Sequence, residues 1–190
     1  MNLIEAFDVL HKMATIQRYS QTRLINPESV LEHTGFVAIL AGLMADECGY
    51  DPGAKLKLLE EALVHDIDEI ITGDIPRPTK YYNKGVTDAL EGVADSNMQE
   101  ISLTLYGNLQ LYHIWRAHKH NIVLQIADKL AVVYKIWQEV ELHGNRNLLP
   151  HITSIKAYLI ERRDRQEMNP KFQNIITQGI EICLRIETYE

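Results

Sequence analysis

Apolar residues recur every three or four positions along almost the whole chain, which is the spacing of an amphipathic α-helix. No stretch alternates between apolar and polar residues with the Val, Ile and Thr enrichment and the flanking turns of a β-hairpin. The pattern therefore predicts an all-α fold, arranged as a single helical bundle.

Helix boundaries are predicted from capping residues and from Gly and Pro. Asn26 and Pro27 are typical of an N-cap and a first helical residue, so they predict the start of the second helix. Gly73, Pro76 and Pro78 predict the end of the third helix and a loop after it. The expected helices cover residues 2–17, 27–48, 54–72, 86–106, 109–118, 121–143, 151–166 and 171–187.

The composition is typical of one globular domain. The chain has 190 residues, 46% of them hydrophobic, so we expect one continuous core and one domain over residues 1–190. The net charge of −7, without any long run of Lys or Arg, argues against a nucleic acid polymer as a partner. A small anionic ligand needs only a local basic spot and is compatible with this charge.

The compartment is predicted from the cysteines and from the hydrophobic runs. Cys48 and Cys183 lie far apart in apolar helical patterns, which favours free thiols in a reducing environment over a disulfide. The first residues carry Glu5 and Asp8 inside an apolar pattern, unlike a signal peptide, and nowhere do 18 apolar residues follow one another. We therefore expect a cytoplasmic protein that does not associate with a membrane.

Three ionisable side chains gather in the expected third helix, in the segment LEEALVHDIDEIITGD. His65 and Glu69 share one face of such a helix, and Asp66 lies close to that face. A His-Asp dipeptide is by itself a weak signal in a chain with 8 histidines. The surroundings of the dipeptide must therefore decide whether it is functional.

Two further candidates lie in apolar helical segments, His33 in VLEHTGFVAILAGLM and Asp128 in IVLQIADKLAVVY. Each has an ordinary structural explanation, because hydrogen bonds can satisfy a buried histidine and a salt bridge from another helix can satisfy a buried aspartate. Together with His65 and Asp66 they offer a second explanation. Two imidazoles and two carboxylates on three helices are suited to bind Mn²⁺, Co²⁺, Fe²⁺, Zn²⁺ or Mg²⁺, and the sequence does not identify which of these ions is bound.

The order His33, His65-Asp66, Asp128 resembles the HD superfamily of metal-dependent phosphohydrolases, and the surrounding sequence resembles its bacterial 5′-deoxynucleotidase (YfbR-like) branch. The resemblance spans most of the chain, and a string of this length does not arise by chance. The segments that carry it are Arg18-Tyr19, ESVLEH up to His33, HDIDEIITGDIPRPTKYYN from His65, IADKLAVVYK around Asp128, and ERRDRQEM at residues 161–168.

The resemblance implies a metal centre beside a reaction site. The implied metal ligands are His33, His65, Asp66 and Asp128. By the same similarity, Glu69 and Asp74 would be the polar groups of the reaction and of the sugar site. A carboxylate one turn from the ligands can accept a proton from water or deliver one to the leaving oxygen, so we expect Glu69 to be the main acid or base.

Substrate contacts are expected from residues around these motifs. By similarity, Arg18 would contact the phosphate, which a guanidinium can grip through two parallel hydrogen bonds. Tyr19 stands where the family usually has Trp, and it can stack on a base, close off the 2′ side of the sugar, or simply pack on the core. Thr79 and Lys80 follow two prolines and are expected beside the substrate, although a solvated surface lysine is an alternative for Lys80.

Three histidines, His113, His118 and His120, lie in a stretch that resembles nothing in the family. Such a group can suggest a second metal ion. Its surroundings, YHIWRAHKHN, are nevertheless typical of a helix end with surface histidines, so we place all three outside the predicted site.

The implied activity is that of a metal-dependent 5′-deoxynucleotidase, which converts a deoxynucleoside monophosphate and water into a deoxynucleoside and phosphate. One alternative is a deoxynucleoside triphosphate triphosphohydrolase like the small phage dATP-cleaving enzymes, in which Arg77, Lys80 and Lys84 would face a longer phosphate chain. Both enzymes cleave at the 5′-oxygen, so the motifs do not separate them. A non-catalytic nucleotide-binding module is a further alternative, and the family resemblance also implies a homodimer.

Overall fold

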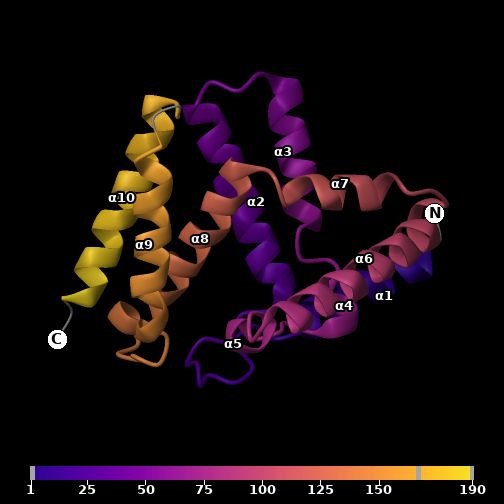
Figure 1. The fold of residues 1–190 in the computed structure, drawn as a ribbon, viewed down its shortest axis with the longest axis horizontal. Coiled ribbons are helices and arrows are strands. Elements are labelled where there is room, and N and C mark those ends of the chain that lie inside the picture. The colour runs from indigo at the N-terminus through magenta and orange to yellow at the C-terminus, as the bar shows by residue number, and fades with distance from the viewer. Residues whose placement is uncertain (1–2, 166–167, 189–190) are drawn as a thin grey trace.

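The computed structural model describes residues 3–165 and 168–188, and within these ranges the chain contains helices and no strand (Figure 1). The all-α prediction is therefore confirmed. Gln166 and Glu167, part of the ERRDRQEM segment, lie outside the described residues. The helices are α1 (Leu3–Thr15), α2 (Val30–Glu47), α3 (Pro52–Val64), α4 (Glu69–Thr72), α5 (Arg77–Lys80), α6 (Lys84–Tyr106), α7 (Gln110–His118), α8 (Ile122–Trp137), α9 (Ile152–Arg163) and α10 (Pro170–Glu187), with a π-helical turn η1 (Gln138–Leu142) after α8 and a 3₁₀ turn η2 (Leu149–His151) before α9.

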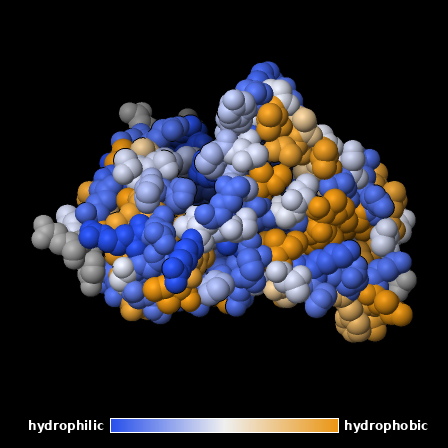
Figure 2. Space-filling view, turned by 90° about the horizontal axis from the view of Figure 1, so that it is seen from below, coloured by the Kyte–Doolittle hydropathy of each residue, from blue (hydrophilic) through white to orange (hydrophobic). Residues whose placement is uncertain are grey.

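Helix α1 exposes a stripe of apolar residues to solvent. Leu3, Phe7 and Leu10 follow one another at helical spacing on one face, and each is at least half exposed. Figure 2 shows hydrophobic residues gathered over the half of that view where α1 and α6 lie. This stripe, which we call the α1 face, is covered by none of the packing contacts described below.

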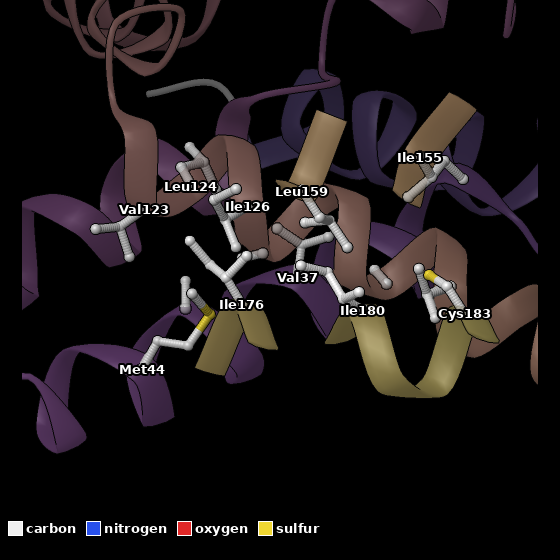
Figure 3. Packing of buried hydrophobic residues seen from close by; sticks show 14 of the residues in the cluster. Val37, Met44, Val123, Leu124, Ile126, Ile155, Leu159, Ile176, Ile180 and Cys183 are labelled. Atoms are coloured by element: carbon white, nitrogen blue, oxygen red, sulfur yellow. The ribbon is translucent and has the colours of Figure 1, made fainter. Parts of the chain in front are cut away.

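Buried apolar side chains form two clusters. The larger cluster packs α2, α3, α8, α9 and α10 together and includes Val37, Leu124 and Ile176 (Figure 3). The smaller cluster packs α1, α6 and α7 and includes Trp115. Val30, at the start of α2, belongs to the smaller cluster, whereas the rest of that helix contributes to the larger one. Helix α2 therefore joins the two halves of the core.

Helix α2 begins at Val30 and not at the predicted Asn26-Pro27. Ser29 is its N-cap: the Ser29 hydroxyl accepts a hydrogen bond from the Glu32 amide (3.2 Å), and the Glu32 carboxylate accepts one from the Ser29 amide (2.7 Å). Ser29 itself has an extended backbone and pairs with Gln17 in an antiparallel bridge, which keeps the residues before it out of the helix. The predicted start was wrong for that reason, and the bridge brings the residues after α1 close to the start of α2.

The helix predicted for residues 54–72 is interrupted. Helix α3 ends at Val64, and α4 begins only at Glu69. Between them lie turns whose hydrogen bonds join residues three apart, from Ile67 to Val64 (3.2 Å) and from Glu69 to Asp66 (3.1 Å). The shared helical face that we predicted for His65 and Glu69 is therefore wrong. Ile67 is buried within the break, so the apolar pattern continues across it and conceals it.

The helices after residue 83 lie close to their predicted ranges. Asn83, Asn121 and Asn169 act as N-caps of α6, α8 and α10, each accepting hydrogen bonds from amides of the first turn. Gly107 ends α6 in the left-handed conformation, at a φ of 69°. The predicted loop with two prolines contains a short helix, α5, because a proline at the start of a helix loses no hydrogen bond.

Both cysteines are free thiols, as predicted. Cys183 is buried and Cys48 is half-buried, and burial raises the pKa of both, that of Cys183 to about 11. Both thiols are therefore protonated at neutral pH. Within the described residues, no helix combines the length and the apolar character that crossing a membrane requires.

A buried ion pair on α8 and η1 fastens the loop before α2. Glu139 is fully buried, and its carboxylate accepts hydrogen bonds from the amides of Ile25 and Asn26, both at 2.9 Å, and from the side chain of Asn145. Lys135 is 2% exposed, lies 3.6 Å from Glu139 and donates to the carbonyl of Asn26. Because each charge has several partners, the cost of burying it is offset. We call this group the loop clamp.

We expect Glu139→Ala to lower the free energy of unfolding by about 3–5 kcal/mol, because it leaves Lys135 buried without its counter-charge and two amides without acceptors. Urea unfolding followed by circular dichroism measures this change. Glu47 is an exposed control that pairs with Lys171 at 3.5 Å, so Glu47→Ala should cost less than about 1 kcal/mol. A cost for Glu139→Ala as small as that of the control would show that the loop clamp does not stabilise the fold.

Candidate metal centre and active-site cavity

The four predicted metal ligands come together from three segments. One ligand atom from each of His33, His65 and Asp66 lies within 4.8 Å of the others. Asp128 adjoins this group, since its Oδ1 is 3.1 Å from Nε2 of His33. His33 comes from α2, His65 and Asp66 from the turns after α3, and Asp128 from α8. The arrangement gathers two imidazoles and the Asp66 carboxylate, with the Asp128 carboxylate next to His33.

The two imidazoles are oriented as ligands would be. Nδ1 of His65 is 2.7 Å from the carbonyl oxygen of Ala62 and donates a hydrogen bond to it, which turns Nε2 toward Oδ2 of Asp66, 3.1 Å away. Within the described part of the chain, this Nε2 has no hydrogen-bond partner. Nε2 of His33 faces both Asp128 and, at 3.7 Å, Asp66, while its Nδ1 lies 3.9 Å from Glu28. A buried nitrogen without a partner beside a carboxylate is what a bound cation would satisfy.

The charges of the centre depend on each other. Burial alone would raise the pKa of Asp66 and of Asp128, but His65 beside Asp66 and Lys129 beside Asp128 hold both pKa values below the usual range. Burial alone would lower the pKa of His65, yet the Asp66 carboxylate raises it to about 9. At neutral pH the proton on His65 therefore compensates Asp66, and a divalent cation would take over that role.

Glu69 differs from the other carboxylates. Burial, together with the nearby charges of Asp66 and Asp74, raises its pKa to about 10. Its Oε2 is buried and has no hydrogen-bond partner within the described residues. Glu69 therefore carries a proton at neutral pH in a place where that proton is available to a bound molecule, which suits a general acid.

A cavity of about 370 Å³ opens beside the metal centre, a size typical of small-molecule sites. Its lining includes His65, Asp66, Glu69, Asp128, Lys80 and His118. A larger hollow of about 580 Å³ lies between α3 and α7, but none of the predicted site residues lines it. The smaller cavity is therefore the candidate active site, because it is the one that contains the reactive groups.

Arg18 and Tyr19 lie next to the centre without lining the cavity. Arg18 pairs with Glu28 at 3.0 Å, and its side chain is 12% exposed. Burial would lower its pKa, but Tyr19 and the carboxylates of Asp66 and Asp128 raise it, so Arg18 is always charged. Tyr19 has a φ of 58°, which is uncommon for a residue with a side chain.

Asp74 ties the turn at Tyr19 to the end of α4. Its Oδ2 accepts a hydrogen bond from the Tyr19 amide at 2.8 Å, and the side chain does not line the cavity, although Gly73 and Ile75 on either side of it do. Lys80 lines the cavity, whereas Thr79 is exposed on α5 outside it. The roles predicted for these residues stay predictions.

One residue of the cavity was missed from the sequence. We predicted His118 to be a surface histidine, and this was wrong, because His118 lines the cavity beside His65. Burial and the charge of His65 lower its pKa to about 4. His113 and His120 are exposed, as predicted. The missed signal is helical spacing, since His118 lies three residues after Trp115, whose side chain is buried.

The sequence is similar to that of known enzymes. The profile of the family described as 5′-deoxynucleotidase YfbR-like matches residues 5–178. A relative from Salmonella typhi with the name 5′-deoxynucleotidase YfbR is 29% identical over 173 residues, which cover 86% of this chain and 85% of the relative. A relative from Salmonella newport with the same name is also 29% identical, over the same shares of both chains. The family resemblance predicted from the motifs is therefore confirmed.

Solved structures share the fold. An HD-domain phosphohydrolase from Listeria innocua superimposes with a TM-score of 0.74 at 22% identity, over the full length of both chains. A protein from Pyrococcus horikoshii gives a TM-score of 0.72 at 21% identity, covering 94% of this chain and 99% of its own. The HD phosphohydrolase of cyanophage S-2L, bound to dA and one catalytic Zn²⁺, gives 0.60 at 18% identity and 95% coverage of both chains. At these identities the likeness is one of fold.

We expect Asp66→Ala to abolish metal uptake, because it removes the carboxylate that faces both imidazoles. Protein stripped with a chelator is reloaded with Mn²⁺ or Co²⁺, desalted and analysed for bound metal by plasma mass spectrometry. The wild-type chain should retain the metal and the variant should not. Asp88→Ala removes an exposed carboxylate that pairs with Lys84 at 2.9 Å, and it should retain the metal like the wild type. Wild-type metal content in Asp66→Ala would refute the ligand assignment.

Proposed function

The chain belongs to the 5′-deoxynucleotidase YfbR-like family, and from this membership we propose that it hydrolyses the 5′-phosphate ester of deoxynucleoside monophosphates. Its products are a deoxynucleoside and phosphate, and it is a hydrolase of the HD superfamily. The observation that carries the proposal is the convergence of His33, His65-Asp66 and Asp128 beside a cavity that Glu69 also lines.

The proposed cofactor is a divalent metal ion held by His33, His65, Asp66 and Asp128. When bound, such an ion polarises a phosphoryl oxygen and lowers the pKa of water, which supplies a nucleophile at neutral pH. Two imidazoles with two carboxylates favour Mn²⁺, Co²⁺, Fe²⁺ or Zn²⁺ over Mg²⁺, because Mg²⁺ prefers oxygen ligands. The other ring nitrogen of His33, Nδ1, lies 3.9 Å from Glu28, beyond hydrogen-bond distance.

Glu69 is the proposed general acid. Breaking the ester bond leaves negative charge on the 5′-oxygen of the sugar, and this oxygen must gain a proton to depart as a hydroxyl. The burial that raises the pKa of Glu69 keeps a proton on its carboxyl group at neutral pH. Asp66 is ionised nearby, so the two carboxyl groups have separate tasks, one as a ligand and one as an acid.

Arg18, Tyr19 and Asp74 are proposed to hold the rest of the substrate. Arg18 uses one amino group to pair with Glu28, which leaves further donors for a phosphate oxygen. The hydrogen bond from Tyr19 to Asp74 fixes the turn that carries both Arg18 and Tyr19. The second oxygen of Asp74 is proposed to accept a hydrogen bond from a sugar hydroxyl, and the ring of Tyr19 to limit space at the 2′ position.

The proposal predicts release of orthophosphate from dAMP and dGMP that depends on added Mn²⁺ or Co²⁺ after treatment with a chelator. Products from dAMP, AMP and dATP are separated by ion-exchange chromatography, and the metal-free Asp66→Ala protein serves as the control. Triphosphate release from dATP would support the triphosphohydrolase instead. Of the three basic residues expected to face a longer phosphate chain, Lys80 lines the cavity, whereas Arg77 and Lys84 do not. The absence of any product would contradict both activities and favour a nucleotide-binding module.

We expect Glu69→Gln to lower kcat about 10²–10⁴-fold, because an amide cannot transfer a proton to the leaving oxygen. Metal content should stay at the wild-type level, since Glu69 is not among the proposed ligands. Steady-state kinetics with dAMP and metal analysis on the same samples measure both quantities. Glu60→Gln changes an exposed glutamate of α3 and should leave kcat unchanged. Near-wild-type kcat in Glu69→Gln would exclude it as the general acid.

A homodimer is proposed on the basis of the family and the α1 face. Leu3, Phe7 and Leu10 are 53%, 60% and 50% exposed, and a second copy of the chain would cover them. Residues 1–190 are proposed to act as one domain in the cytoplasm. Light scattering at micromolar concentration should give twice the mass of the chain, and a monomer mass would contradict the dimer.

A further inference from the structure

His118 reaches the cavity from the C-terminal end of α7. Its ring centroid lies 6.2 Å from that of His65 with the planes at 79°, and 5.7 Å from that of Trp115 with the planes at 71°. Trp115 is itself fixed, because its Nε1 donates a hydrogen bond to Asp68 at 3.1 Å. The imidazole of His118 is therefore held between two aromatic rings, with little freedom to change its position.

His118 is not placed to be a metal ligand. The ligand atoms that lie within 4.8 Å of one another belong to His33, His65 and Asp66, and Asp128 adjoins them through its 3.1 Å contact with His33. His118 instead meets His65 ring to ring, with the centroids 6.2 Å apart. An imidazole has at least one N–H donor in either protonation state, so His118 can donate a hydrogen bond to a molecule that occupies the cavity. His118 lines the same cavity as His65, Asp66 and Asp128, so it lies near the proposed position of the phosphoryl group.

The wall of the cavity around His118 carries donors. Lys119 follows His118 and lies over the ring of Trp115, with its Nζ 4.2 Å from the centroid, and Lys80 lines the same cavity. Both lysines are exposed and have long, flexible side chains, whereas His118 is half-buried. A phosphoryl group has several oxygens, and those that do not bind the cation are stabilised by hydrogen-bond donors that are already in position before the reaction. Of these three side chains, His118 is the one that is half-buried and lies between two aromatic rings.

We propose that His118 contacts the substrate and donates a hydrogen bond to a non-bridging oxygen of the phosphoryl group beside the metal centre. This inference rests on the proposed function. It adds to the proposed phosphate contact of Arg18 a second one from α7, in a stretch outside the family motifs.

The test compares His118→Phe with His118→Gln in the full chain loaded with Mn²⁺. Phe keeps a ring between Trp115 and His65 but has no donor, whereas Gln keeps a donor. We expect His118→Phe to lower kcat/KM for dAMP about tenfold to a hundredfold and to raise the inhibition constant of orthophosphate by a similar factor. His118→Gln should recover part of both losses, and His113→Leu, on the exposed side of α7, should change neither.

Metal content and thermal stability separate a substrate contact from a structural role. Both should match the wild type in His118→Phe, and loss of metal from this variant would overturn the inference by making His118 a ligand. An unchanged inhibition constant of orthophosphate would also overturn it, because a residue that only packs does not affect phosphate affinity. Should His118→Phe fail to fold, His118→Leu replaces it in the same comparison.

Failure of the proposed function gives a different result. If the wild-type protein releases no phosphate from dAMP, calorimetric titration of the Mn²⁺-loaded protein with orthophosphate still tests His118. Weaker orthophosphate binding by His118→Phe than by the wild type would then support the contact, and equal binding would refute it.

Discussion

The carboxylate of Asp66 lies between two imidazoles at the wall of the cavity, and the surrounding structure compensates its charge. His65 is 3.1 Å away and His33 is 3.7 Å away, and Arg18 is near enough to help keep Asp66 ionised. A buried carboxylate without such partners would be costly. The turn that carries Asp66 therefore holds it where both α2 and the loop before α2 reach it.

This compensation also separates the tasks of neighbouring carboxyl groups. The charge of Asp66 is one reason why Glu69, in the next helical turn, keeps its proton. Two carboxyl groups with similar ordinary pKa values thus differ in protonation at neutral pH, because Glu69 is buried beside anionic neighbours whereas Asp66 has cationic partners. The break between α3 and α4 matters here, since it lets Asp66 face the imidazoles while Glu69 lines the cavity with an unpartnered oxygen.

The periodicity of apolar residues predicted the all-α class, because that spacing is a property of each helix alone. The resemblance to the HD motifs predicted that His33, His65 and Asp66 would lie close together. Other features depend on partners distant in the sequence. Helix α2 starts at Ser29 because residue 17 pairs with it, and the loop clamp joins Glu139 to amides more than a hundred residues earlier. The break after Val64 is hidden because Ile67 continues the apolar pattern. Local spacing contains no information about these contacts.

The histidines of α7 show where local spacing was informative and was not used. Leu111, Trp115 and His118 follow one another at intervals of four and three residues, so they share the face on which Leu111 and Trp115 are buried, whereas His113 lies off it. That face packs against α1 and α6 in the smaller cluster, which Ile67, two residues after His65, also joins, and His118 at its end lies beside His65. The stretch that departs from the family motifs thus supplies a wall of the cavity. Because the four proposed metal ligands lie outside α7, we expect a change in this helix to alter what the cavity accepts without removing those ligands.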